Sequence, residues 1–139
     1  MTVRVRIAAG DVVAIAELDE DGSPDASRAF AGALPIEGEL LGSMWSGNAC
    51  ELALPSTLAG LVGTGRASTE VPVGSLALAP TVAGPILMIA YGETISHTAT
   101  GPAPASRLGR IVEGQEAFLA RLARTFDEGA IPVRLTVER

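Results

Sequence analysis

The sequence contains no lysine, because its 10 basic residues are all arginine. Without a lysine amine, the chain cannot be a Schiff-base enzyme, a pyridoxal enzyme or a P-loop nucleotide hydrolase. One cysteine and one histidine exclude an intrachain disulfide and the usual Cys/His zinc sites. Aromatic residues make up only 4% of the chain, so the core must be built from Val, Leu, Ile and Ala.

The sequence also lacks any concentration of positive charge. The net charge is −6, and the arginines are spread from Arg4 to Arg139 with no group larger than a pair. Proteins that bind nucleic acid place several cations together, so we expect no nucleic-acid partner. We read the acidic balance as a solvated surface.

Long apolar runs are missing too. The most apolar stretch, 76–91, is interrupted by Pro80, Gly84 and Pro85, and a membrane span takes roughly 20 apolar residues. The first ten residues alternate arginine with apolar residues, unlike the apolar centre of a signal peptide. We therefore expect no membrane partner and a cytoplasmic protein whose Cys50 stays reduced.

Hydrophobic residues make up 47% of the 139 residues, which is enough for one domain, 1–139, with a real core. Val3, Val5 and Ile7 alternate with polar residues, as in a half-buried strand, and 12–18 is typical of a return strand after the turn at 10–11. Ser23 and Pro24 have the residue types of an N-cap and a first helical turn, and Pro35 would end that helix.

The remaining patterns predict further strands and a second helix. After Gly114 a helix is expected whose face carries Phe118, Leu119, Leu122 and Phe126. Residues 55–72 read as a long loop, and loops of that length are often functional. The expected strands are 39–45, 49–54, 74–79, 85–91, 94–98, 108–112 and 131–137. Eight or nine short strands without regular strand–helix alternation predict a mainly β fold, a mostly antiparallel barrel capped by two helices.

Residues 108–114, Leu-Gly-Arg-Ile-Val-Glu-Gly, closely resemble the cyclophilin stretch of a hydrophobic residue, Gly, a basic residue, two aliphatics, Glu and Gly before a helix. Residues 74–79 and 84–89 resemble two consecutive cyclophilin strands. The Trp45-Ser46-Gly47 turn and the Tyr91-Gly92 pair make the chain most similar to the short prokaryotic cyclophilin-like proteins of uncharacterised function.

This resemblance implies a closed barrel of eight strands with a helix over each open end. It also implies a test of activity, because cyclophilins polarise the prolyl amide with an arginine assisted by a glutamine. The corresponding strand pair here, 40–52, contains neither residue, and Ile86 stands where the family's other glutamine pattern matches. Arg66, in the long loop, is the one arginine that could compensate. Efficient prolyl isomerisation is therefore not expected.

The favoured function is binding of a small molecule or short peptide in a pocket of the barrel wall. Trp45 could floor such a pocket by stacking, or it could simply close the barrel as a rim aromatic. The loop 55–72 could fold over the pocket. The expected ligand-binding residues are Trp45, Asn48, Arg66, Pro85, Tyr91 and His97.

The alternative is a small hydrolase or isomerase with His97 as base and Glu93 as its partner. In an extended segment Tyr91, Glu93 and His97 would share one face, which suits acid–base work. The competing interpretation of His97 is an exposed loop histidine. A weak prolyl isomerase and a pure interaction module remain open. We expect no metal site and no cofactor, we read Cys50 as a buried hydrophobe, and a mean hydropathy of +0.35 allows a homo-oligomer.

Overall fold

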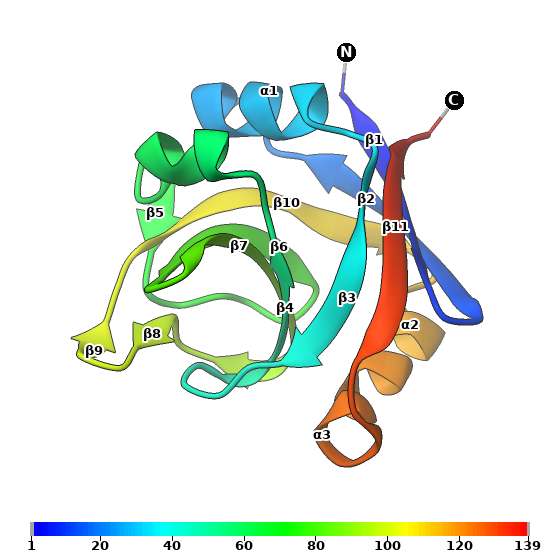
Figure 1. Cartoon of the computed structure of the whole chain (residues 1–139). Coiled ribbons are helices and arrows are strands. Elements are labelled where there is room, and N and C mark those ends of the chain that lie inside the picture. The colour runs from blue at the N-terminus through cyan, green and yellow to red at the C-terminus, as the bar shows by residue number, and fades with distance from the viewer. Residues whose placement is uncertain (1, 139) are drawn as a thin grey trace.

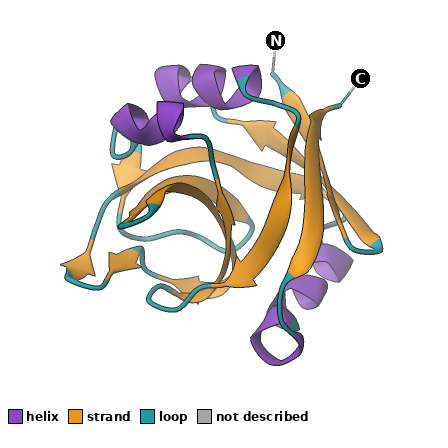
Figure 2. Cartoon of the chain, viewed as in Figure 1, coloured by secondary structure: helices purple, strands orange, loops and turns teal. Residues whose placement is uncertain are grey.

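The computed structural model describes residues 2–138 and is mainly β. Eight antiparallel strands close into a barrel, with a few short helices outside it (Figures 1 and 2). The barrel strands are β1 (Arg4–Ala9), β2 (Val12–Leu18), β3 (Ile36–Gly42), β4 (Gly47–Ala53), β6 (Ser75–Thr81), β7 (Gly84–Thr94), β10 (Ala105–Glu113) and β11 (Ile131–Val137).

Around the barrel the strands follow the order β2, β1, β11, β3, β4, β7, β6 and β10, and β10 pairs back onto β2. The first and last strands are therefore neighbours, with Val5 opposite Val137. Closure leaves the eight strands without a free sheet edge. The mainly β, closed antiparallel barrel expected from the sequence is confirmed.

The strand positions follow the apolar pattern closely. Val5, Ile7 and Ala9 are fully buried while Arg6 between them is exposed, as period-two alternation requires. The strand predicted at 39–45 lies three residues earlier, as β3. The strand predicted at 85–91 is longer in the structure, since β7 begins one residue earlier and ends three residues later. The expected strand 94–98 is divided between the end of β7 and β8 (His97–Thr98), which pairs with β9 (Gly101–Pro102).

Helices lie on opposite sides of the barrel in Figure 1. Near one side are α1 (Pro24–Gly32) and the 3₁₀ helix η1 (Ser56–Leu61); near the other are α2 (Gln115–Ala123) and α3 (Thr125–Glu128). No helix in residues 2–138 is long and apolar enough to cross a membrane.

Local details differ from the expectations at three places. Phe126 does not extend the apolar face of the second helix, because the helix breaks at Arg124 and Phe126 is 82% exposed on α3. Ser23 is the N-cap residue of α1, as expected, but its hydroxyl does not bond the first helical turn; it accepts a hydrogen bond from the Arg66 N–H. Segment 55–72 is not wholly loop, since it contains η1 and β5 (Ala67–Ser68), which pairs with β10.

The barrel strands bury side chains on both of their faces. Inside, Leu52, Leu76, Leu87 and Ile89 belong to the main core. Outside, apolar side chains of β4, β6, β7, β10 and the segment before β6 form a second buried cluster, which we call the outer-wall cluster: Ala49, Val71, Ala77, Ala79, Ile86, Met88, Ala90 and Ala105. A buried outer face on a barrel must be covered by other chain segments. Here Val71, in the segment before β6, packs into the cluster from outside the barrel.

Candidate functional site

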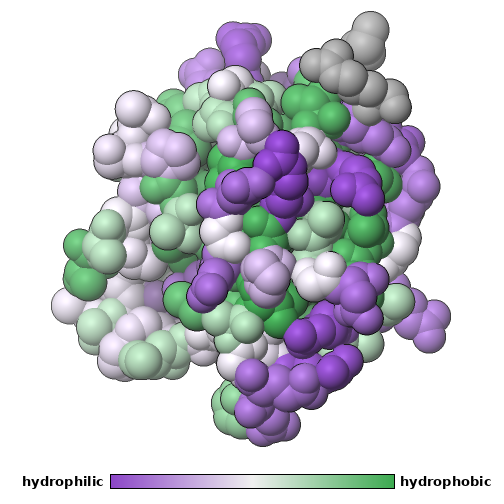
Figure 3. Space-filling model, turned by 45° about the vertical axis from the view of Figure 1, so that its right-hand side comes forward, coloured by the Kyte–Doolittle hydropathy of each residue, from purple (hydrophilic) through white to green (hydrophobic). Residues whose placement is uncertain are grey.

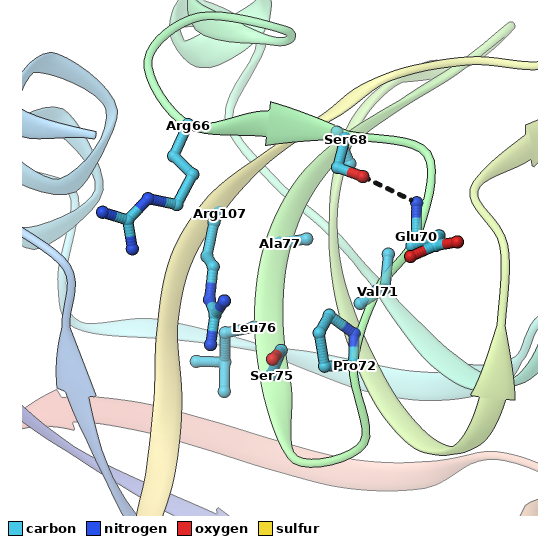
Figure 4. Close-up of a pocket in the computed structure, with 10 residues that line it drawn as sticks. Arg66, Ser68, Glu70, Val71, Pro72, Ser75, Leu76, Ala77 and Arg107 are labelled. Carbon is cyan, nitrogen blue, oxygen red and sulfur yellow. Dashed lines mark hydrogen bonds between the residues drawn. The ribbon is translucent and has the colours of Figure 1, made fainter. Parts of the chain in front are cut away.

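A cavity of about 210 Å³ lies on the outer-wall cluster, and we call it the wall cavity. Apolar atoms of Val71, Pro72, Leu76, Ala77 and Ala105 form much of its lining. Polar groups stand at its margins: Arg66, Ser68, Glu70, Ser75 and Arg107 (Figure 4). An apolar floor with a few polar side chains around it is the usual composition of a small-molecule site.

The segment from Arg66 to Pro72 forms one wall of this cavity and is fixed by backbone hydrogen bonds. Val71 N–H donates to the Thr94 carbonyl, and Ser96 N–H donates to the Thr69 carbonyl, at 3.2 and 2.7 Å. These bonds lay the segment along the end of β7. The predicted functional loop 55–72 therefore contributes five lining residues: Arg66, Ser68, Glu70, Val71 and Pro72.

Arg66 ties this segment to two other parts of the chain. Its N–H donates to the Gly22 carbonyl at 2.8 Å, and its carbonyl accepts from the Arg107 N–H at 2.8 Å. Its guanidinium points away from Val71 in Figure 4, and its Nη1 lies 3.3 Å from Asp19 Oδ2. Arg66 is the one member of the expected ligand-binding set that lines the wall cavity.

The opposite wall comes from β10, where a bulge between Arg107 and Gly109 changes the strand's phase. Residues three apart on a regular strand face opposite sides, but Leu108 and Ile111 are both in the main core. The bulge thus leaves Arg107 and Arg110 on the outside together. Gly109 is required here, because a Cβ would overlap the Glu17 carbonyl where β10 closes the barrel onto β2.

A second cavity, of about 220 Å³, adjoins the first, because Arg66 and Arg107 line both. We call it the arginine cavity, since Arg110 also lines it. Its other lining residues are Thr2, Glu17, Leu18, Asp19 and Gly109. Arg66 has Asp19 as an ion-pair partner, whereas within residues 2–138 neither Arg107 nor Arg110 has a salt bridge or a side-chain hydrogen bond.

The other expected site residues lie elsewhere. Neither cavity is lined by Trp45, Asn48, Pro85, Tyr91 or His97. Trp45 is 55% exposed in the β3–β4 turn, and Asn48 is exposed at the start of β4. Pro85 is buried at one end of β7 and Tyr91 lies six residues on, about 20 Å along an extended strand. Pro85 and Arg66 therefore lie apart from the rest of the set, whereas Trp45, Asn48 and His97 lie on neighbouring segments, because Gly47 pairs with Thr94 and the Thr94 hydroxyl donates to the Asn48 carbonyl.

Glu93 and His97 share a neighbourhood with Trp45 but form no catalytic contact in residues 2–138. Ser46 joins the two segments: its hydroxyl accepts from the His97 N–H at 2.9 Å, and its carbonyl accepts from the Ile95 N–H at 2.9 Å. The half-buried His97 ring has its Nδ1 3.0 Å from the Ile95 carbonyl oxygen, and Glu93 is exposed. An acid–base role for this pair stays a prediction.

Cys50 is buried in the barrel core near α3. Its Sγ lies 3.2 Å from the Thr125 hydroxyl and 3.5 Å from the Leu122 carbonyl. Burial raises the pKa of the thiol, and burial also raises the pKa of Tyr91, which packs against the same core. Both groups are therefore protonated at neutral pH, so Cys50 is not poised as a thiolate nucleophile. In residues 2–138 no three His, Cys, Asp or Glu side chains are grouped to hold a metal ion.

Sequence reasoning missed Arg107, Val71 and Ala77 as lining residues. The Leu108-Gly109-Arg110 motif is part of the family resemblance in the sequence. A glycine inside an otherwise apolar strand is a bulge signal, and a bulge there moves Arg107 and Arg110 to one side. Local sequence therefore indicates the bulge, whereas the cavity beside the two arginines depends on segments distant in the chain.

Comparison with known proteins gives a family and a fold. A family model described as "Protein of unknown function (DUF3830)" matches residues 5–137. No curated protein matches the chain in sequence. Among solved structures, the hypothetical protein AF2241 from Archaeoglobus fulgidus is similar over 99% of this chain and 95% of its own, at 23% identity and a TM-score of 0.67.

McbB, solved in complex with tryptophan, is similar over 95% of this chain at 20% identity and a TM-score of 0.70. The chain spans 44% of the length of McbB. At these identities the two likenesses establish the shared fold.

Proposed function

Because the chain belongs to the DUF3830 family, whose description names no activity, we propose from its own geometry that it binds a small molecule or a short peptide in the wall cavity. The observation that carries the proposal is Arg107, which is half-buried beside an apolar floor and has no ion-pair or side-chain hydrogen-bond partner in residues 2–138. A cation partly removed from water without a counter-charge is costly, and a ligand can offset that cost.

The size of the cavity limits the ligand. At about 210 Å³ it is smaller than the roughly 300–1,000 Å³ of sites for drug-sized molecules. A compact metabolite, or one side chain of a peptide, fits that space. The tryptophan complex of McbB supports the idea that proteins containing this fold hold compact organic ligands.

Blocking the mouth of the cavity tests this proposal. Ser68 is exposed at the rim on β5, so Ser68→Trp would lay an indole across the opening. The matched control is Ser56→Trp, because Ser56 is exposed on η1 and does not line the cavity. We would screen a metabolite library by thermal shift on the unmodified protein and titrate the hits against both variants.

Compounds that raise the melting temperature should bind Ser68→Trp at least about 10-fold more weakly and bind Ser56→Trp unchanged. Arg107→Ala provides a second variant should the indole disturb folding. Absence of any stabilising compound, or equal binding to all the variants, would overturn the proposal.

We also propose that the barrel is cyclophilin-like but does not catalyse prolyl isomerisation efficiently. In support, β3 and β4 carry no arginine or glutamine, and Ile86 is buried in the outer-wall cluster. The arginines that reach the outer wall come instead from β10 and from the segment before β5. A proline-peptide assay should give the uncatalysed rate; acceleration that disappears in Arg107→Ala would contradict this.

A further inference from the structure

Arg107 differs from the arginines that have clear structural partners. Arg4 contacts Glu113 and Glu138, Arg124 pairs with Glu128 and Arg134 pairs with Glu37. Arg107 is half-buried and has no such partner in residues 2–138. Its side chain runs along β10 toward Ser75 and Leu76 in Figure 4, on the boundary of the two cavities.

Arg110, in the arginine cavity on the far side of that boundary, is a second arginine without such a partner in residues 2–138. The β10 bulge is what allows both arginines to face outward, and Gly109 between them lets β10 approach β2 closely. Bulges commonly re-aim side chains beside functional sites. Two guanidinium groups held on a strand of a closed barrel form a more fixed anion site than two on a flexible loop.

The charge of the arginine cavity selects the type of anion. Its lining holds three arginines against the carboxylates of Glu17 and Asp19, which leaves one positive charge in excess. A carboxylate, with one negative charge, balances that excess. A phosphate monoester carries about −1.5 to −2 near neutral pH and would leave the site negative.

We propose that the ligand is a small carboxylic acid whose apolar body lies on Val71 and Ala77 in the wall cavity and whose carboxylate is bound by Arg107 and Arg110. This inference rests on the proposed function and adds the substrate class. Arginine binds carboxylates through paired, charge-assisted hydrogen bonds, so the acid should be strongly preferred to its neutral amide.

The test uses a panel of aromatic and branched aliphatic carboxylic acids, each with its primary amide, and phenyl phosphate as the alternative anion. Affinities are measured by calorimetry on the full chain and on Arg107→Gln and Arg110→Gln. Arg6→Gln is the matched control, because Arg6 is an exposed strand arginine that has no ion pair in residues 2–138 and lines neither cavity.

At least one acid should bind about 10-fold or more tightly than its amide. Each of Arg107→Gln and Arg110→Gln should weaken that acid by about 10-fold to 100-fold and leave the amide unchanged, while Arg6→Gln changes neither. Thermal melts of all three variants check that the fold is retained.

Three results would overturn the assignment. Acid and amide binding equally, or the two arginine variants leaving the acid unaffected, would remove the carboxylate contact. If phenyl phosphate bound more tightly than every acid, the ligand class would be a phosphate ester rather than a carboxylic acid. Neutral library compounds blocked by Ser68→Trp, with no acid bound, would refute this inference while supporting the wall cavity itself.

Discussion

Gly109 illustrates how one residue can set the geometry of both cavities. It lies where β10 meets β2, and a Cβ there would overlap the backbone carbonyl of Glu17. Backbone cannot move aside as a flexible side chain can, so an alanine would push β10 outward. The positions of Arg107 and Arg110 depend on the β10 bulge, which includes the backbone next to Gly109.

Gly109→Ala should therefore lower the free energy of unfolding by about 1–3 kcal/mol or more, as overpacking does. Gly32→Ala is the control, because nothing lies within 4 Å of a Cβ at the end of α1; it should be neutral or stabilising by up to about 1 kcal/mol. Urea denaturation measures both. Equal stability of the two variants would show that the strands separate freely at this point.

Cys50 and Tyr91 make the fold sensitive to alkali. Burial raises the pKa of each group above the ordinary values of 9.0 and 10.0, so the folded state keeps protons that the unfolded state releases. Their stabilisation is complete below the unfolded-state pKa and is lost as the pH rises through the folded-state pKa. Unfolding free energy should therefore fall between about pH 8 and pH 11.

The double variant Cys50→Ala, Tyr91→Phe should show a shallower decline over the same range, whatever its stability at neutral pH. Chemical denaturation at a series of pH values supplies the comparison. Parallel curves for the two proteins would mean that other groups control alkaline unfolding.

At the scale of elements, the C-terminal helical region separates into two unequal parts. Phe118 and Leu122 on α2 are fully buried against the barrel, whereas Phe126 on α3 is 82% exposed. Helical spacing alone predicts a single apolar face, but the break at Arg124 redirects the chain. Arg124 then pairs with Glu128 across one turn.

Phe118→Ala should cost about 3–5 kcal/mol of unfolding free energy, as expected for a large buried aromatic. Phe126→Ala should cost less than about 0.5 kcal/mol, the range of ordinary surface changes. Thermal or urea unfolding distinguishes them readily. A large loss for Phe126→Ala would imply that α3 packs against something through that ring.

The segment 55–72 shows where element prediction stops. Its Gly, Ser and Thr content correctly marks a region outside the barrel strands, and five of its residues line the wall cavity. The path of its backbone could not be predicted from the sequence, because its hydrogen bonds are made with partners distant in the chain, such as Gly22, Thr94 and Arg107. Local propensity carries no information about such partners.

At the scale of the whole molecule, the closed barrel depends on β2, which pairs with both β1 and β10. Ala16 stands opposite Val5 on one side and Ile111 on the other. A strand flanked on both sides has its N–H groups in the hydrogen-bond ladders, and proline there removes a donor and adds a clash. A proline at Ala16 would therefore disturb the pairing of β2 with both β1 and β10, and with it the closure of the barrel.

Ala16→Pro should lower the unfolding free energy by more than about 2 kcal/mol or prevent folding. Val82→Pro is the control, because Val82 is 98% exposed in the β6–β7 turn, where proline is well tolerated. Circular dichroism and urea unfolding compare the two. A folded Ala16→Pro protein as stable as the control would mean that the β2 pairings contribute little to closure.

The surface mixes hydrophilic and apolar side chains. On the face drawn in Figure 3, hydrophilic side chains are interspersed with separate apolar areas. The exposed apolar residues include Leu41, Met44 and Trp45 at the end of β3 and in the turn after it. Self-association through such residues stays a prediction.

The sequence by itself determined the fold class. Several local signals indicate many short antiparallel strands: the period-two alternation of apolar residues in β1, the apolar runs of β6 and β7, and the turn residues between them. It also excluded lysine chemistry and the common zinc sites. The tertiary structure alone decided which residues meet. Arg66 and Arg107 are far apart in the chain but line the same two cavities, whereas Trp45 and His97 line neither. Strand register, the β10 bulge and barrel closure set these positions, and none of them is a local property of the sequence.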